Sequence, residues 1–142
     1  MGAAIIEIQL PNQERGKYGI TDLGIRRSNK YYYIIIRMFS SKKIQQVWEK
    51  GVIVDGYDPS KWRKDFAGAW IRRDLYGTGH EYGWAIDHLR PRAAGGSDDI
   101  DNLTPLNSRN NISKAADFPT FVTVITSNGN KNIERRRRWL LQ

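Results

Sequence analysis

The sequence predicts a single α+β domain, because the chain is of one-domain length and mixes strand-like runs with short helix-like segments. Its 142 residues are enough to bury a core without a disulfide or metal staple. No repeat and no linker-like composition divides it. Dense aromatic and β-branched runs predict strands, and apolar residues between a polar start and a glycine stop predict short helices.

The first sixty residues predict a β-rich region that ends in a helix. We expect a strand at 3–10 and the strongest strand of the chain at 29–39, where "NKYYYIIIRMF" is a dense run of aromatic and β-branched residues. The Gly- and charge-rich residues between them predict loops with a short strand at 18–25. Residues 40–51 run from a serine to a glycine around Ile44, Val47 and Trp48, which predicts an amphipathic helix.

The remaining residues alternate between extended and helical patterns, separated by Gly- and Asp-rich turns. We expect helical turns within 55–68, strands at 69–77 and 84–91, a loop at 92–102, an extended piece at 103–106, a helix at 107–117, a strand at 120–126 and a terminal helix at 131–142. Asn107 or Ser108 is the expected N-cap of the helix at 107–117.

Composition restricts the chemistry that the chain can perform. With no cysteine, thiolate nucleophiles, Cys-ligated zinc and disulfide scaffolds are excluded. Only two histidines are present, so a bound metal would be held mainly by oxygen ligands, which suits magnesium or manganese. The formal charge of +8 favours polyanionic partners, nucleic acid first and acidic membranes second, although plain solubility also explains it.

The opening "MGAAIIEIQL" has no basic start, and its apolar run is too short for secretion or for a membrane span. We therefore expect a cytoplasmic protein with no membrane partner.

One stretch places chemistry-bearing residues at a defined spacing. Asp87-His88 is followed after thirteen residues by Asn102, after eight more by Asn111, and after two more by Lys114. The first pair lies on a predicted strand, so the two side chains point to opposite faces. The last pair lies on a predicted helix three residues apart, and hence on one face.

This spacing resembles the HNH endonuclease family, in the variant with asparagine in the third position. The same spacing occurs in the HNH domain of RNA-guided DNA nucleases, and the flanking "YGWAIDHLRP" and "GGSDDIDNLTPL" resemble stand-alone bacterial and phage HNH proteins. The resemblance covers residues 61–116. It implies a ββα-metal core there, with 1–60 as an N-terminal β-rich extension and 117–142 as a C-terminal strand and basic helix.

The resemblance also implies roles for the motif residues. His88 would be the general base, and Asn102 would accept a hydrogen bond from its ring. Asp87 and Asn111 would bind one divalent cation, Mg²⁺ with Mn²⁺ as a substitute. The substrate backbone would be held by basic side chains near the motif, namely Lys114, Arg109, Arg90, Arg92, Arg72 and Arg73.

Each motif residue also has an ordinary structural interpretation. His88 could be a structural histidine bonded to Asp87, and the two asparagines could be a turn residue and a helix cap. The acids of the loop, Asp98, Asp99 and Asp101, are interpreted as turn residues that bond to backbone N–H groups. The run Arg135–Arg138 is interpreted as a solvated helix end, with contact to a duplex backbone as the alternative.

Two departures from relatives bear on the prediction. Ala85 stands where relatives often carry glutamate, which leaves any accessory role at that position open. Many HNH proteins are braced by a zinc knuckle with cysteine ligands. This chain has no cysteine, so we expect no structural zinc. The brace must come from packing, with the N-terminal strands as a candidate.

We therefore predict a metal-dependent DNA endonuclease that nicks duplex DNA as a monomer, with double-strand cleavage requiring either a homodimer or two successive events. One alternative is a non-catalytic nucleic-acid-binding module on the same fold. Another is the toxic nuclease domain of an antibacterial effector, held by an inhibitor protein. The target sequence and the choice between DNA and RNA stay open.

Overall fold

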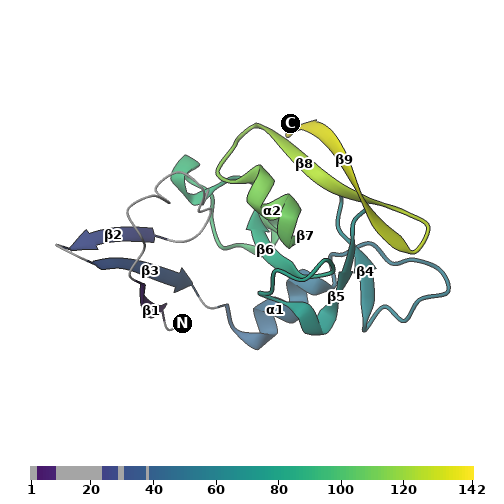
Figure 1. Ribbon diagram of the computed structural model, residues 1–142, viewed down its shortest axis with the longest axis horizontal. Coiled ribbons are helices and arrows are strands. Elements are labelled where there is room, and N and C mark those ends of the chain that lie inside the picture. Colours follow the sequence, from purple (N-terminus) through teal and green to yellow (C-terminus); the bar gives the residue numbers. More distant parts are fainter. Residues whose placement is uncertain (1–2, 9–23, 29–30, 38) are drawn as a thin grey trace.

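The computed structural model describes residues 3–8, 24–28, 31–37 and 39–142, and over these residues the protein mixes helices and strands (Figure 1). The elements are β1 Ala3–Ile8, β2 Gly24–Ser28, β3 Tyr31–Arg37, α1 Ser41–Trp48, β4 Trp62–Lys64, β5 Trp70–Arg72, β6 Trp84–His88, β7 Leu103–Asn107, α2 Ser108–Lys114, β8 Thr120–Asn128 and β9 Lys131–Leu140. Among the described helices, none is long and apolar enough to span a bilayer.

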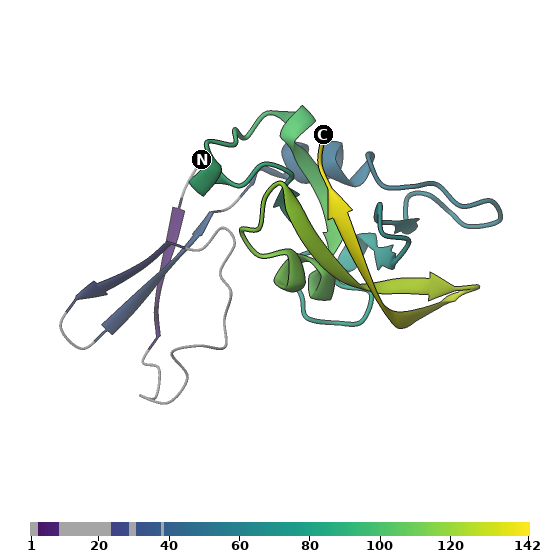
Figure 2. The ribbon, with the colours of Figure 1, turned by 90° about the horizontal axis from the view of Figure 1, so that it is seen from above.

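The first three strands form an antiparallel sheet in the order β1-β3-β2. This agrees with the strands predicted at 3–10 and 29–39. The strand predicted at 18–25 falls mostly outside the described residues, and β2 begins only at Gly24. Both views draw this sheet to one side of the other elements (Figures 1 and 2).

Strands β6 and β7 form an antiparallel pair that runs directly into helix α2. In their register Asp87 faces Thr104 and His88 faces Leu103. Helix α2 begins where β7 ends, and the Asn107 side chain caps it by accepting a hydrogen bond from the Arg109 backbone N–H at 3.0 Å. The strand, helix and cap predicted from the sequence are therefore present, with β6 ending at His88.

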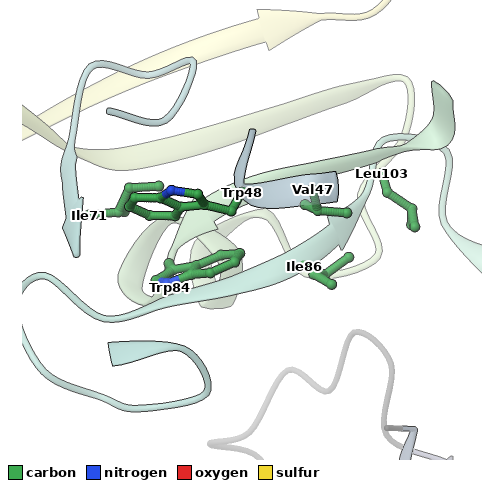
Figure 3. Close-up of a cluster of buried hydrophobic side chains, with 6 residues drawn as sticks. All are labelled: Val47, Trp48, Ile71, Trp84, Ile86 and Leu103. Carbon is green, nitrogen blue, oxygen red and sulfur yellow. The ribbon is translucent and has the colours of Figure 1, made fainter. Parts of the chain in front are cut away.

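The hydrophobic core lies between α1 and the β6–β7 pair. It consists of six buried side chains, drawn in Figure 3, which are Val47, Trp48, Ile71, Trp84, Ile86 and Leu103. The rings of Trp48 and Trp84 lie 5.3 Å apart and tilted, a favourable arrangement for aromatic pairs. The alternation of side chains along β6 thus directs Trp84 and Ile86 toward α1.

The helical turns predicted within 55–68 are wrong. Residues 62–64 form strand β4, which pairs with β5 so that Trp62 faces Arg72 and Lys64 faces Trp70. The Trp62 ring meets the rings of Trp70 and Tyr82 edge to face. These contacts to residues distant in sequence favour the extended form over the local helical preference.

The terminal helix predicted at 131–142 is also wrong, because residues 131–140 form strand β9. This strand pairs with β8 from Asn128↔Lys131 to Thr120↔Leu140, across a two-residue loop. Gly129 opens that loop with a φ of 59°, the position that a type II′ hairpin turn reserves for glycine. The "SNGNKN" turn signal therefore outweighs the helical preference of the arginines that follow it.

Candidate active site

Strand β6 separates the two central motif residues onto opposite faces. Asp87 and His88 are each only 2% exposed. His88 lies on the face that Trp84 and Ile86 direct toward α1, and Asp87 lies on the other face, toward α2. The opposite orientation predicted for this pair is thus what the strand produces.

On the α2 side, Asp87 forms a buried ion pair with Lys114. The Lys114 Nζ lies 3.2 Å from Asp87 Oδ2 and donates a 3.0 Å hydrogen bond to the His88 carbonyl oxygen. The lysine is completely buried, with its ammonium above the Phe121 ring. The predicted contact between Lys114 and substrate phosphate needs correction, because this ammonium compensates the Asp87 charge inside the protein.

Asn111 lies on the same face of α2 as Lys114, one turn earlier, and therefore on the side of the helix that meets Asp87. Its Oδ1 atom is buried and accepts no hydrogen bond from any described residue. A buried oxygen in this state carries a desolvation cost of about 1–3 kcal/mol, which a donor or a cation would remove. The amide oxygen of Asn111 and the carboxylate of Asp87 are the ligand types that a hard divalent cation prefers.

These two side chains fit a magnesium-type cation in the chemistry of their donor atoms. They do not make a dense acidic cluster: within residues 39–142, where side chains are described, no group of three His, Cys, Asp or Glu residues could hold a metal. Two protein ligands are in keeping with Mg²⁺, which usually keeps several of its waters.

On the α1 side, the His88 ring hydrogen-bonds to a loop carboxylate. His88 Nε2 lies 2.8 Å from Asp98 Oδ1, and the ring packs beside Phe39. Asp98 also pairs with Arg92. Burial acts to raise the Asp98 pKa, but the bonds from His88 and Arg92 outweigh it and lower that pKa. The interpretation of Asp98 as a simple turn residue therefore needs correction.

The hydrogen bonds of Asn102 go to other described residues and not to the His88 ring, so the predicted hydrogen bond between this pair is absent. Its Nδ2 donates to the carbonyl oxygens of Arg90 and Ser97, and its Oδ1 accepts from the Arg90 N–H at 2.9 Å. A Cβ on Gly96 would lie 1.7 Å from the Arg90 carbonyl oxygen, so the loop closes this tightly only with glycine there. Asn102 thus holds the backbone that follows His88.

The arginines predicted to bind substrate divide into three places. Arg90 and Arg92 lie on the loop after His88, where Arg90 bonds the Ala94 carbonyl oxygen. Arg109 lies on α2 and pairs with Glu134 of β9 at 2.7 Å.

The other two, Arg72 and Arg73, line a surface hollow of about 660 Å³. Arg72 pairs there with Asp74 at 2.6 Å, and Arg73 donates to Gln45 of α1 at 3.1 Å.

A buried carboxylate that the sequence did not single out, Asp65, anchors the start of α2. Its side chain accepts hydrogen bonds from the Ala69 and Asn107 backbone N–H groups and from Asn110 Nδ2, at 2.8–3.0 Å. Burial raises the Asp65 pKa to about 6, against the lowering effect of these hydrogen bonds. The carboxylate therefore ties the turn between β4 and β5 to the helix that carries Asn111.

Asn110, the neighbour of Asn111, connects α2 to strand β8. Its Oδ1 accepts from the Val124 and Ile125 N–H groups at 2.8 and 2.7 Å, and its Nδ2 donates to the Ile125 carbonyl oxygen. The residue is fully buried. The brace on this side of the site is thus the C-terminal hairpin. Its only signal in the sequence is a pair of asparagines inside a helix, where they are unfavourable unless bonded.

The strand pair, its loop and the following helix all lie within a segment that a comparison with protein families identifies. Residues 76–116 match the HNH endonuclease family model. The matched segment contains Asp87, His88, Asn102, Asn111 and Lys114, so the resemblance predicted from the motif is confirmed. No curated protein and no solved structure matches the chain. The HNH segment indicates a nuclease with a nucleic-acid substrate.

Proposed function

We propose that the protein is a metal-dependent DNA endonuclease, with one Mg²⁺ per site, that nicks duplex DNA as a monomer. The observation that carries the proposal is the pairing of α2 with β6 inside the HNH segment. The helix face that bears Asn111 and Lys114 lies over Asp87, and the buried Asn111 oxygen has no hydrogen-bond partner in the described part of the chain. An oxygen in this state needs a cation or a donor.

In this proposal each side of β6 has its own task. Asp87 and Asn111 hold the divalent cation, which when bound supplies positive charge for the phosphate. His88 takes the proton from the attacking water, since a neutral imidazole is available near neutral pH. Only 2% of His88 is exposed, so the ring must become accessible before it can act. Arg90, Arg92 and Arg109 are candidates for contacts with the DNA backbone.

Asp98 takes the positioning role that the sequence assigned to Asn102. Its bond to Nε2 orients the His88 ring, and Arg92 holds Asp98 in place. A carboxylate at one ring nitrogen selects the tautomer and orientation of an imidazole, as in catalytic triads.

A nicking assay tests the proposed activity. Supercoiled plasmid should be nicked with Mg²⁺ or Mn²⁺ and left intact with EDTA. His88→Ala should lower the rate by about 10²–10⁴-fold, the usual cost of losing a positioned base. His80→Ala is the matched control and should cleave normally, because His80 is exposed and its ring nitrogen only accepts from the Tyr82 backbone N–H. Full activity in EDTA, or in folded His88→Ala, contradicts the proposal.

The role of Asp98 predicts a different pattern. Asp98→Asn should lower kcat by about 10-fold or more and shift the pH profile of kcat, because a neutral amide no longer stabilises the protonated ring. KM should change little. A drop in activity that merely follows a lower melting temperature, with an unchanged pH profile, would mean that Asp98 only supports the loop.

The burial of the site favours a second candidate, a nucleic-acid-binding module without catalysis. His88 is buried, and Lys114 already supplies a cation to Asp87. Such a module would bind duplex DNA and leave plasmid intact with every divalent cation.

A further inference from the structure

Four consecutive arginines on β9, Arg135–Arg138, differ from all the other arginines whose side chains are described. Each of those six is hydrogen-bonded or ion-paired: Arg63 to carbonyl oxygens, Arg73 to Gln45, Arg90 to Ala94, and Arg72, Arg92 and Arg109 to carboxylates. The four on β9 are exposed, and none has a hydrogen-bond or ion-pair partner in the described part of the chain.

A β-bulge decides which way these arginines point. Thr123 faces Arg137 and Ile125 faces Glu134, so two residues of β9 lie opposite Val124 alone. Thr123 and Ile125 are buried, which identifies their face as the inner one. Arg137 belongs to this inner face and lies over the Trp139 ring.

The side chains next to Arg137 in the strand point to the outer face. Arg138 faces Val122, which alternates with the buried Phe121 and Thr123, so it lies on the outer face. Arg136 lies two residues from Arg138 and shares that face, and Arg135 is the extra residue of the bulge. The outer face of the hairpin is thus a cationic ribbon beside the small side chains of Val122 and Val124.

This ribbon is joined rigidly to the helix of the site. Glu134, directly before the arginine run, pairs with Arg109 of α2. The Val124 N–H, opposite the bulge, donates to Asn110 of the same helix. Figures 1 and 2 both show β8 passing beside α2, and β9 is paired to β8. A ligand held by the ribbon therefore lies at a set position relative to Asn111.

We propose that the outer face of the β8–β9 hairpin docks the phosphate backbone of duplex DNA, beyond the contacts of the HNH segment itself. Guanidinium groups bind phosphate oxygens in a forked geometry, and exposed ones without partners are available for it. On the outer face Arg136 and Arg138 lie two residues apart, which is about 6–7 Å along the strand. The phosphates of one DNA strand follow one another about every 3.4 Å of helix axis. The two guanidinium groups can therefore meet alternate phosphates of one strand. The inference rests on the nucleic-acid substrate of the proposed function.

Binding measured in EDTA tests this surface separately from cleavage. A fluorescent 20-base-pair DNA duplex is titrated with the full chain at several salt concentrations. Arg136→Gln with Arg138→Gln removes two outer-face charges, and the slope of log Kobs against log salt should become shallower by about 1.8. Arg136→Lys with Arg138→Lys keeps the charges and should keep the slope.

Two matched controls remove one charge each elsewhere. Arg137→Gln changes the inner face of the same strand, and Lys42→Gln changes an exposed position of α1. Both should leave the slope nearly unchanged, with melting temperatures that show every variant folded.

The docking proposal is wrong if the slope of log Kobs against log salt falls by the same amount per charge removed in all the glutamine variants, because net charge alone then explains binding. It is also wrong if the outer-face pair weakens only single-stranded DNA, or has no effect. If the chain never nicks plasmid but shows the expected slope change, the docking proposal stands and only the nuclease proposal fails.

Discussion

Asp87 and His88 are neighbours in the sequence, yet the two faces of β6 that carry them are supported by different parts of the chain. The Asp87 face is closed by α2, which Asp65 and the C-terminal hairpin hold through Asn107 and Asn110. The His88 face is closed by α1 and by the loop between β6 and β7. On that side Lys43 of α1 donates to the Asp98 carbonyl oxygen at 3.1 Å.

The two supports also differ in kind. On the Asp87 side buried polar groups hydrogen-bond to one another. Each of these bonds matters for stability, because an unpaired polar group is costly in a buried, low-dielectric environment. On the His88 side partly exposed side chains hold a loop backbone, as Lys50 and Asn102 do. The proposed metal site therefore depends on a rigid, buried network, whereas the proposed base depends on a surface loop. Substitutions should separate the two.

The largest effect should come from breaking the ion pair on the Asp87 face. Lys114→Met leaves a buried carboxylate without its ammonium partner and should cost about 3–5 kcal/mol of unfolding free energy. A denaturant titration measures this. Combining it with Asp87→Asn should recover most of the loss, because no buried charge is then left over.

The effect of Mg²⁺ on the melting temperature of Lys114→Met tests the proposed cation site. If Asp87 and Asn111 bind the cation, Mg²⁺ should raise the melting temperature of Lys114→Met more than that of the wild type. An equal shift in both proteins, or none, would argue against a cation at this position. A Lys114→Met protein of wild-type stability would show that the ammonium contributes nothing to Asp87.

A smaller effect is expected at Asp65, and it should depend on pH. The folded pKa of about 6 lies above the ordinary value of 3.8, so the folded protein binds this proton more tightly than the unfolded chain. Stability from this group is full below about pH 4 and is lost as pH rises toward 6, by about 2–3 kcal/mol.

Asp65→Asn removes that titration. It also turns one acceptor oxygen into a donor facing the Asn107 and Asn110 donors, which should cost about 1–3 kcal/mol at pH 7. The stability difference from wild type should therefore be larger at pH 4 than at pH 7. A difference that stays constant over this range would mean that Asp65 is ionised throughout.

The smallest effect should come from the loop on the His88 face. Asn102→Ala removes three hydrogen bonds from a partly exposed loop and should cost about 1–2 kcal/mol. In combination with Lys114→Met the two losses should add within about 0.5 kcal/mol, as for independent sites. Strong coupling in this double-mutant cycle would show that the two faces of β6 share one support.

Local signals explain what could be predicted from the sequence. Strand β6 and helix α2 follow from their own residues, because the alternating pattern of "WAIDH" and the Asn107 cap act within a few positions. The motif spacing identified the HNH segment in the same way, since it needs only the order of five residues.

Partners distant in sequence explain what could not. The role of Lys114 depends on its complete burial against Asp87, which its position on the helix does not reveal. The sequence predicts only a turn residue at Asp98. Its bond to His88 forms because the loop folds back onto the strand, and local sequence does not reveal that return. The arginines of β9 are compatible with a helix, and only their pairing with β8 makes them a strand.

The bonds of Asn110 have a consequence for how the protein is made. During synthesis Asn110 is added to the chain 14 residues before Val124, and the Asn110 side chain accepts from the N–H groups of Val124 and Ile125. Until the hairpin is synthesised, this buried amide lacks its partners on β8, and the helix next to Asp87 lacks that support. The 76–116 segment that suffices for recognition of the family is therefore shorter than the smallest unit that should fold. A fragment ending at residue 116 should carry the whole motif and remain unstructured.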